Sequence, residues 1–245
     1  MTSIKIQPIA PDDPDLESSK LLDAVYKTIR YAKENGGVGL TQTKAFDRKF
    51  SHWAAENFNW EEYSAEKLLS IQKVLNEQDV MPVMLLHELL VDMKLGRHIK
   101  GKFQFSKKAL VLAENRGSFF SKLANFYLFE FDHSNFQRRP FTAPGNWNVF
   151  LNVINVEAHD GASEAHLLEV FFGFSPSDIG AEDYWRYLSF LHWHVLTSLH
   201  WIGFLDKTVV GDQLSERETF YAKTPLWRKC LKLDTDKNLR PILVH

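Results

Sequence analysis

The sequence has almost no cysteine and no long apolar run. Cys230 is the single cysteine among 245 residues, which excludes an internal disulfide and suits a reducing compartment. No apolar run approaches the roughly 18 residues that a membrane-spanning helix requires. The opening residues, MTSIKIQPIAPDDPD, are too acidic for a secretory signal, and their apolar part is too short. We therefore expect a cytoplasmic protein that makes no contact with a membrane.

Catalytic motifs are also missing. The chain contains no Gly-x-Ser-x-Gly nucleophile motif. The segment GGVG at residues 36–39 lacks the spacing of a phosphate-binding loop, and it follows a helical pattern instead of a strand. Cys230 lies in the apolar context LWRKCLKL, which is typical of a packed residue. We predict no catalytic residue and no cofactor, and a non-enzymatic protein is favoured.

Neither sign of charge dominates. Lysine and arginine number 29 and aspartate and glutamate 31, so the formal net charge is −2. This excludes a global attraction to nucleic acid or membranes, and binding of either kind would need a local patch. Aromatic residues are abundant instead, with 19 Phe, 7 Trp and 7 Tyr, and they can fill a substantial helical core. The length predicts one large or two small domains.

The rest of the chain is organised around residues 85–114, LLHELLVDMKLGRHIKGKFQFSKKALVLAE. Apolar residues recur at helical spacing up to Gly96, where we expect the helix to end. Residues 97–100 and 102–105 flank Gly101 and predict a minimal hairpin, and Ser106 predicts the N-cap of a following helix. This order of helix, hairpin and helix is typical of the second half of a winged-helix module.

The residues before this stretch predict the first half of the same module. We expect an extended arm over residues 1–12, followed by a helix that starts near Pro14 and stops at residues 35–37, Asn-Gly-Gly. A short strand is predicted at residues 38–41. Thr41 or Thr43 is expected to cap the next helix, and Ser64 the helix after it.

The C-terminal half repeats this pattern. Residues 147–156 read as a helix or as a strand, and their periodicity does not decide between the two. Residues 182–202 predict one long helix, with Leu188, Val195 and Leu199 buried. Its tryptophans are expected to widen the buried face: Trp185, Trp193 and Trp201. A second hairpin is expected near residues 203–223, and the segments GLTQTKAF, FQFSKKAL and FYAKTPLW share a strand, a Ser or Thr cap and a helix start.

These patterns predict a mainly α protein with short β-hairpins, built from two winged-helix-like modules packed together. We place the N-terminal module with its arm at residues 1–132, a connecting loop at 133–146 and the C-terminal module at 147–245.

Two segments, GGVGLTQTKAFDRKFSHWAAE and LGRHIKGKFQFSKKALVLAE, carry a resemblance to a known family. They resemble the helical C-terminal region of a family of uncharacterised bacterial open reading frames that are often plasmid-borne. Ser106 stands where that family has a second Thr, and Ala109 where it usually has Gly. The resemblance covers about residues 36–115. It implies a winged-helix-like architecture, and it supplies no catalytic residue.

Basic residues form the most useful functional feature, because a cationic hairpin and helix could contact DNA phosphates. The alternative interpretation is a solvated rim of charges, and the apolar helix before the hairpin does not suit the reading of bases. His98 could add positive charge at lower pH. The candidate nucleic-acid-binding residues are Lys44, Arg48, Lys49, Arg97, Lys100, Lys102, Lys107 and Lys108.

Histidine and acidic residues between positions 157 and 166 raise the question of a metal site. Their spacing matches no standard zinc motif, so we predict no metal. The weaker alternative is a metal-dependent enzyme that uses Glu157, His159, Asp160, Glu164 and His166.

The sequence therefore leaves two main function classes. We favour a non-enzymatic interaction module that mediates protein association, either with a partner protein or with itself, because the aromatic abundance could extend to an exposed patch. The alternative is non-specific or regulatory DNA binding through the basic hairpin.

Overall fold

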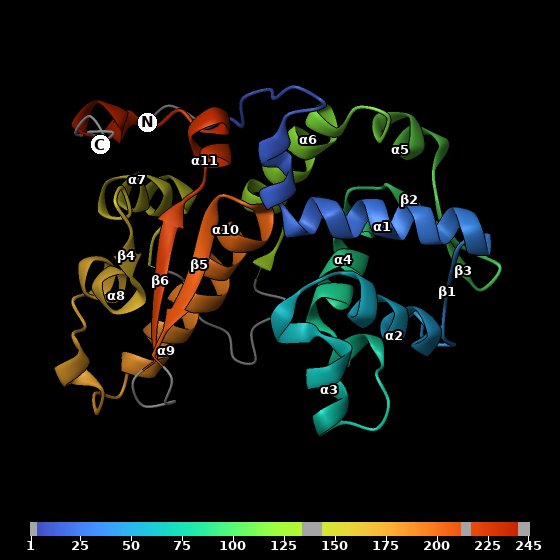
Figure 1. Ribbon diagram of the computed structural model, residues 1–245, viewed down its shortest axis with the longest axis horizontal. Coiled ribbons are helices and arrows are strands. Elements are labelled where there is room, and N and C mark those ends of the chain that lie inside the picture. Colours follow the sequence, from blue (N-terminus) through green and yellow to red (C-terminus); the bar gives the residue numbers. More distant parts are fainter. Residues whose placement is uncertain (1–3, 134–143, 212–216, 240–245) are drawn as a thin grey trace. The chain divides into compact units, whose positions relative to one another are not determined.

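The computed structural model describes residues 4–133, 144–211 and 217–239. It is mainly helical, with two small antiparallel sheets (Figure 1). The chain divides into two compact units. The N-terminal unit comprises residues 10–13 and 20–127, and the C-terminal unit comprises 14–19 and the residues from 128 onward together with the first nine. Among the described residues, no helix has both the length and the apolar character to cross a membrane.

The N-terminal unit joins a helical framework to a three-stranded sheet with the strand order β1-β3-β2. Val38 in β1 and His98 in β2 both lie opposite Phe103 in β3, whose side chain is fully buried. The elements are α1 (Lys20–Asn35), β1 (Val38–Gly39), α2 (Arg48–Asn57), α3 (Ala65–Ile71), α4 (Met81–Asp92), β2 (Gly96–Ile99), β3 (Lys102–Phe105), α5 (Lys107–Leu112) and α6 (Arg116–Phe129).

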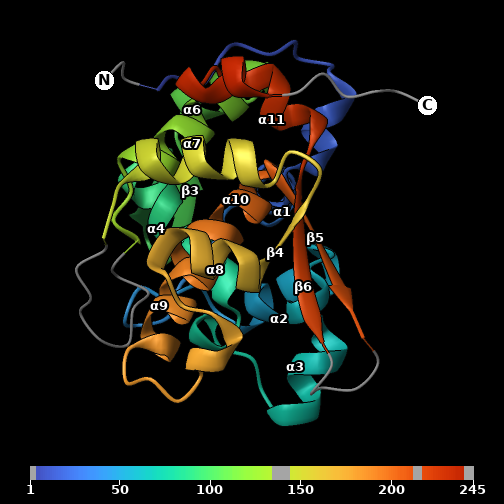
Figure 2. The same ribbon diagram turned by 90° about the vertical axis from the view of Figure 1, so that its left-hand side faces the viewer.

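The C-terminal unit carries its own three-stranded sheet, in the order β4-β6-β5. Figure 2 shows the long strands β5 and β6 of this sheet side by side. Residues 147–157 are helical, which decides the ambiguity of that segment. The elements are α7 (Trp147–Glu157), β4 (Ala162–Ser163), α8 (Glu164–Phe172), α9 (Tyr184–Phe190), a π-helical segment (Leu191–Leu196), α10 (Thr197–Ile202), β5 (Leu205–Val210), β6 (Glu218–Lys223) and α11 (Pro225–Cys230).

The two units share one chain path. In each, a helix leads to a short strand, further helices and a hairpin, and the second hairpin strand lies in the middle of the sheet. Ser106 and Thr224 follow that middle strand, and each side chain accepts an N–H from the first turn of the next helix. The backbone N–H of Ser106 also donates to the carbonyl of Leu95 at 2.9 Å, and that of Thr224 donates to the carbonyl of Phe204 at 3.1 Å. Leu95 and Phe204 are the residues that directly precede the two hairpins. The repeated sequence pattern therefore corresponds to a repeated topology.

Several local predictions are confirmed. The hairpins at 96–105 and 205–223 form, and Ser64 and Ser106 cap the helices that follow them. The predicted connecting loop lies largely outside the described residues, since 134–143 are not described, and so does the turn of the second hairpin at 212–216.

Two terminus predictions in the N-terminal unit are wrong. Asp47, not a threonine, caps α2, and its carboxylate accepts the N–H of Phe50 at 2.8 Å. Lys94 adopts the left-handed conformation after α4, with φ at 55°, whereas Gly96 already belongs to β2. Gly96 is required for space, because a Cβ there would lie 2.3 Å from the ring of Phe103.

The long C-terminal helix differs from its prediction in which face is buried. It is helical from Tyr184 to Ile202, with the π-helical segment in its middle. Val195 and Leu199 are buried as expected, but Leu188 is partly exposed. Trp201 is buried, whereas Trp185 and Trp193 are exposed, contrary to the sequence prediction. Trp185 and Leu188 lie in α9, before the π-helical segment, and Trp193 lies within it.

Candidate functional site

Seven of the eight predicted cations are exposed on the N-terminal unit, five of them on the hairpin, in the turn before α2 and on α5. Arg97 and Lys100 are exposed on the β2–β3 hairpin, and Lys44 is exposed in the turn before α2, with φ at 68°. Lys107 and Lys108 are exposed in the first turn of α5.

The other three cations make hydrogen bonds within the fold. The Lys102 ammonium donates to the carbonyl of Asn35 at 2.6 Å, which ties β3 to the end of α1. The Lys49 ammonium donates to the side-chain oxygen of the same Asn35 at 3.3 Å. The Arg48 guanidinium donates to the side-chain oxygen of Asn76 at 2.9 Å. Lys102 therefore supports the fold, and it is less available to a ligand than Arg97 or Lys100.

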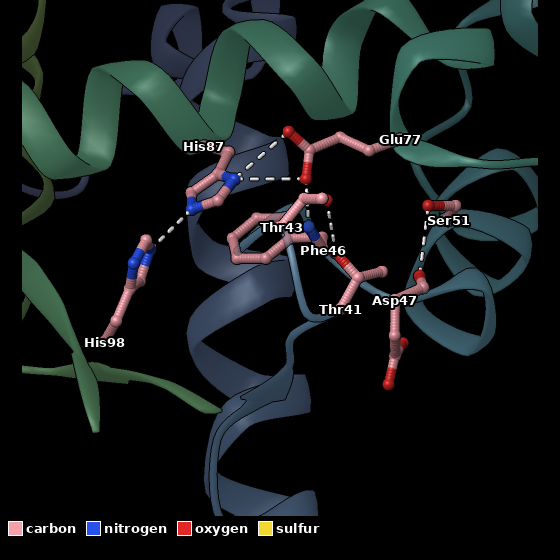
Figure 3. A network of polar contacts seen from close by, with 8 residues as sticks. All are labelled: Thr41, Thr43, Phe46, Asp47, Ser51, Glu77, His87 and His98. Carbon is pink, nitrogen blue, oxygen red and sulfur yellow. Dashed lines mark hydrogen bonds and ion pairs between the residues drawn. The ribbon is translucent and has the colours of Figure 1, made fainter. Parts of the chain in front are cut away.

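A row of three titratable side chains, joined by hydrogen bonds, connects the hairpin to α4 and to the short 3-10 helix before α4 (Figure 3). Glu77 begins a short 3-10 helix, His87 lies on α4 and His98 on β2. The His87 Nδ1 atom is 3.1 Å from both carboxylate oxygens of Glu77, and its Nε2 atom is 2.9 Å from the Nε2 atom of His98. Glu77 and His87 are buried, whereas His98 is exposed.

The surrounding residues hold the inner end of this chain in place. The carboxylate of Glu77 also accepts the backbone N–H of Phe46. The Phe46 ring stacks on the His87 imidazole, with ring centres 3.9 Å apart. The sequence pattern singled out His98 and missed its two partners, although a histidine on the apolar face of a predicted helix is a signal that could have found His87.

The electrostatic surroundings of His98 disfavour its protonation. Partial burial lowers the pKa of His98, and positive charge on His87 and on Lys44 lowers it further. The carboxylate of Glu77 acts in the opposite direction. Glu88 lies next to His87 in the chain, and its pKa is raised by burial and by the charges of Asp92 and Glu77.

The histidines and acids between 157 and 166 separate into pairs instead of converging. The His166 Nε2 atom is 2.8 Å from Glu157, and Glu164 is 2.7 Å from the Nδ1 atom of His192. His159 lies 3.3 Å from the ammonium of Lys223, and Asp160 is exposed. In the described part of the chain, no three His, Cys, Asp or Glu side chains come together in a way that could hold a metal ion.

The core of the C-terminal unit contains a buried polar network that the sequence did not indicate. Asn155 is 1% exposed, and its side-chain oxygen accepts from the Lys223 ammonium at 3.0 Å and from the Trp227 indole at 3.1 Å. Its amide nitrogen donates to Thr235 at 3.0 Å and to Asp236 at 2.9 Å. Burial lowers the pKa of Lys223 to about 8.

The helix α9 and the following π-helical segment expose two large aromatic side chains. Trp185 is 58% exposed and Trp193 is 43% exposed, with the exposed Ser189 midway between them in sequence. Trp185 packs edge-on against Tyr184 at 5.3 Å, and Trp193 packs edge-on against His192 at 4.8 Å. We call the surface that carries Trp185, Ser189 and Trp193 the Trp185–Trp193 face.

The fold and these sites define a helical protein of two units, each with a small antiparallel sheet. Two family models match the chain, one described as the Y4jL N-terminal domain over residues 17–118 and one described as the y4jL C-terminal domain over residues 137–225. The chain is 34% identical over 146 residues to the uncharacterized protein y4jL of Sinorhizobium fredii (strain NBRC 101917 / NGR234). That alignment covers 59% of this chain and 66% of the relative.

The chain is thus similar in both halves to the y4jL family, an uncharacterised bacterial family with an N-terminal and a C-terminal domain. No solved structure matches the chain significantly. The resemblance seen in the sequence is confirmed at the level of an uncharacterised bacterial family, and the matched descriptions name no activity.

Proposed function

We propose that this protein is a non-enzymatic, winged-helix-like interaction module that associates with a second copy of itself through the Trp185–Trp193 face. The winged-helix assignment is supported by the shared order of helix, strand, helices and hairpin in the two units. In this interpretation, each β-hairpin is a wing, and the helix before it occupies the place of the recognition helix.

The exposure of Trp185 and Trp193 is the observation that carries the proposal. Tryptophan is enriched at protein interfaces and among the residues that dominate their binding energy. Two tryptophans held at fixed positions offer large apolar contacts at a small cost in conformational entropy. Such a surface fits a protein better than it fits a nucleic-acid backbone, which requires cations.

The order of Trp185, Ser189 and Trp193 along the helix favours a second copy of this protein as the partner. Ser189 lies between the two tryptophans, and a small residue there allows two antiparallel helices to approach closely. A two-fold axis near Ser189 would then place Trp185 of each copy against Trp193 of the other, as an isologous interface requires. The net charge of −2 opposes association only weakly.

Removal of the two indoles tests the proposal. The Trp185→Ala/Trp193→Ala variant should dissociate at concentrations where the parent is dimeric, with a dissociation constant raised at least about 30-fold, since each anchor contributes about 1–2 kcal/mol or more. Sedimentation velocity over a dilution series measures the change. Folding should be preserved, because both side chains are exposed.

A matched control uses another exposed apolar surface, on and after α3 in the N-terminal unit. Ile71 is 81% exposed, with Leu69 and Val74 also exposed nearby. The Ile71→Ser/Leu69→Ser variant should dimerise like the parent. A parent that is monomeric at about 100 μM, or a dimer that depends on Ile71 and not on the tryptophans, would contradict the proposal.

DNA binding is a second candidate, favoured by the exposure of Lys44, Arg97 and Lys100 near the hairpin. Against it, α4 buries most of its side chains, and its exposed positions include Val91 and Asp92, which do not suit base reading. Any contact would therefore be to phosphates, independent of sequence.

Charge removal on the hairpin tests this second candidate. If DNA binds, Arg97→Ala/Lys100→Ala should weaken it about equally for unrelated sequences and reduce the salt slope by about 0.9 for each phosphate that the protein no longer neutralises. Titrations at two salt concentrations measure both effects. Lys102 is not replaced in this variant, because its ammonium donates to the carbonyl of Asn35 at the end of α1 and its loss would disturb the fold. If the parent shows no salt-sensitive binding at low ionic strength, this function is excluded.

A further inference from the structure

We propose that His87 and His98 form a proton-controlled contact, which holds the β2–β3 hairpin on α4 when the pair carries at most one extra proton and releases it when both imidazoles are charged. The proposal concerns the N-terminal unit only, and it does not depend on the association surface of the C-terminal unit.

The hydrogen-bond partners define the protons of the neutral pair. An ionised carboxylate only accepts hydrogen bonds, so the Nδ1 atom of His87 carries a proton that it donates to Glu77. In neutral His87 the Nε2 atom is then an acceptor. The contact of 2.9 Å between the two Nε2 atoms therefore requires His98 to donate.

One additional proton leaves this contact intact. A protonated His87 donates from both ring nitrogens, to Glu77 and to His98, and the Nε2 atom of His98 becomes the acceptor. A second proton removes that acceptor. Both Nε2 atoms would then be N–H donors on positively charged rings, and the two rings repel each other at this distance.

The mobile member of the pair is His98. His87 is buried, stacked on Phe46 and bonded to Glu77, whereas His98 is exposed on an edge strand. The doubly charged pair therefore separates by outward movement of His98. This removes one of the side-chain contacts between β2 and α4 and weakens the docking of the hairpin.

The charged groups around the pair determine the direction of the effect. Glu77 faces His87, Lys44 lies near His98, and Glu88 and Asp92 add negative charge along α4. The pKa of His98 is lowered in the folded chain, so the open hairpin binds a proton more readily than the closed one. The contact between His87 and His98 therefore stabilises the closed hairpin fully above about pH 6.5. This stabilisation is lost as the pH falls through the folded-state pKa of His98.

Amide hydrogen exchange and imidazole NMR of the full chain test the proposal. Between pH 7.5 and 5, the protection factors of the β2–β3 amides, corrected for the intrinsic pH dependence of exchange, should fall by about tenfold for each unit by which the pKa of His98 is lowered. Imidazole nitrogen shifts should show a proton on the Nδ1 atom of His87 throughout and charging of His98 over the same pH range.

Three variants separate this mechanism from its alternatives. In His98→Gln, the amide can still donate to His87 but does not titrate, so the hairpin should stay protected at pH 5. His166→Gln, an exposed control in the C-terminal unit, should behave like the parent. Glu88→Gln should retain the pH dependence, because the carboxyl of Glu88 is not part of the contact.

Specific outcomes would overturn the proposal. Protection in the parent that does not change with pH, or a loss in His98→Gln equal to that in the parent, would show that the pair does not control the hairpin. Disappearance of the pH dependence in Glu88→Gln would assign it to that carboxyl. Opening of the hairpin by EDTA at pH 7.5 would show that a bound metal ion, not a proton, joins the two imidazoles.

Discussion

Replacement of Val195 by Asp is expected to unfold the C-terminal unit. Val195 is 1% exposed on the central helix, among side chains that include the fully buried Leu191 and Leu199. A carboxylate there has no partner and must either remain charged in an apolar interior or take up a proton, and both cost free energy. We expect a loss of about 4 kcal/mol or more, a large part of the stability of an ordinary domain.

Thermal unfolding followed by far-UV circular dichroism measures this effect. The same substitution at an exposed position controls for the introduction of a carboxylate. Val170 is 42% exposed on α8 of the same unit, so Val170→Asp should change the stability by only about 0.5 kcal/mol. A Val195→Asp variant that melts at the temperature of the parent would contradict the central position of this helix.

The second large effect is expected from Asn155. The Asn155→Leu change keeps the branching at Cγ but removes every side-chain hydrogen bond of Asn155, including those to Lys223 and Trp227. The Lys223 ammonium would keep the backbone carbonyl of Asn155 at 2.7 Å and lose the closer of its two side-chain partners, at 3.0 Å, with His159 remaining at 3.3 Å. Because a buried charge that loses its partner is costly, we expect a loss of about 3 kcal/mol in the free energy of unfolding.

Urea unfolding at pH 7 measures the loss, and two comparisons assign its cause. Asn238→Leu, at an exposed position of the same unit, should have little effect. Lys223→Met in the Asn155→Leu background should restore part of the lost stability, because it removes the ammonium that lacks its acceptor. If the double variant is less stable than Asn155→Leu alone, the unpaired charge is not the cause.

The properties of neighbouring residues are sufficient to predict where the helices and hairpins lie along the chain. Ser64, Ser106, Ser163 and Thr224 cap helices because a side-chain oxygen can reach an N–H three residues later, a contact that needs no tertiary structure. Asp47 shows where this reasoning fails, since Thr41 and Thr43 lie shortly before it and also carry a side-chain oxygen that could serve as a cap.

The surfaces and polar groups that come together depend on how distant segments pack. His87 and His98 meet because the chain reverses after α4, and Asn155 meets Lys223 across 68 residues. The outward position of Trp185 was not readable, because a helix with aromatic residues on every side has no periodicity that marks its exposed face. The caps, the hairpins and the repeated order of elements can thus be predicted from the residues alone, since these features depend on neighbours along the chain. The histidine pair, the buried lysine network and the exposed tryptophans depend on the packing of distant segments, and the structure alone revealed them.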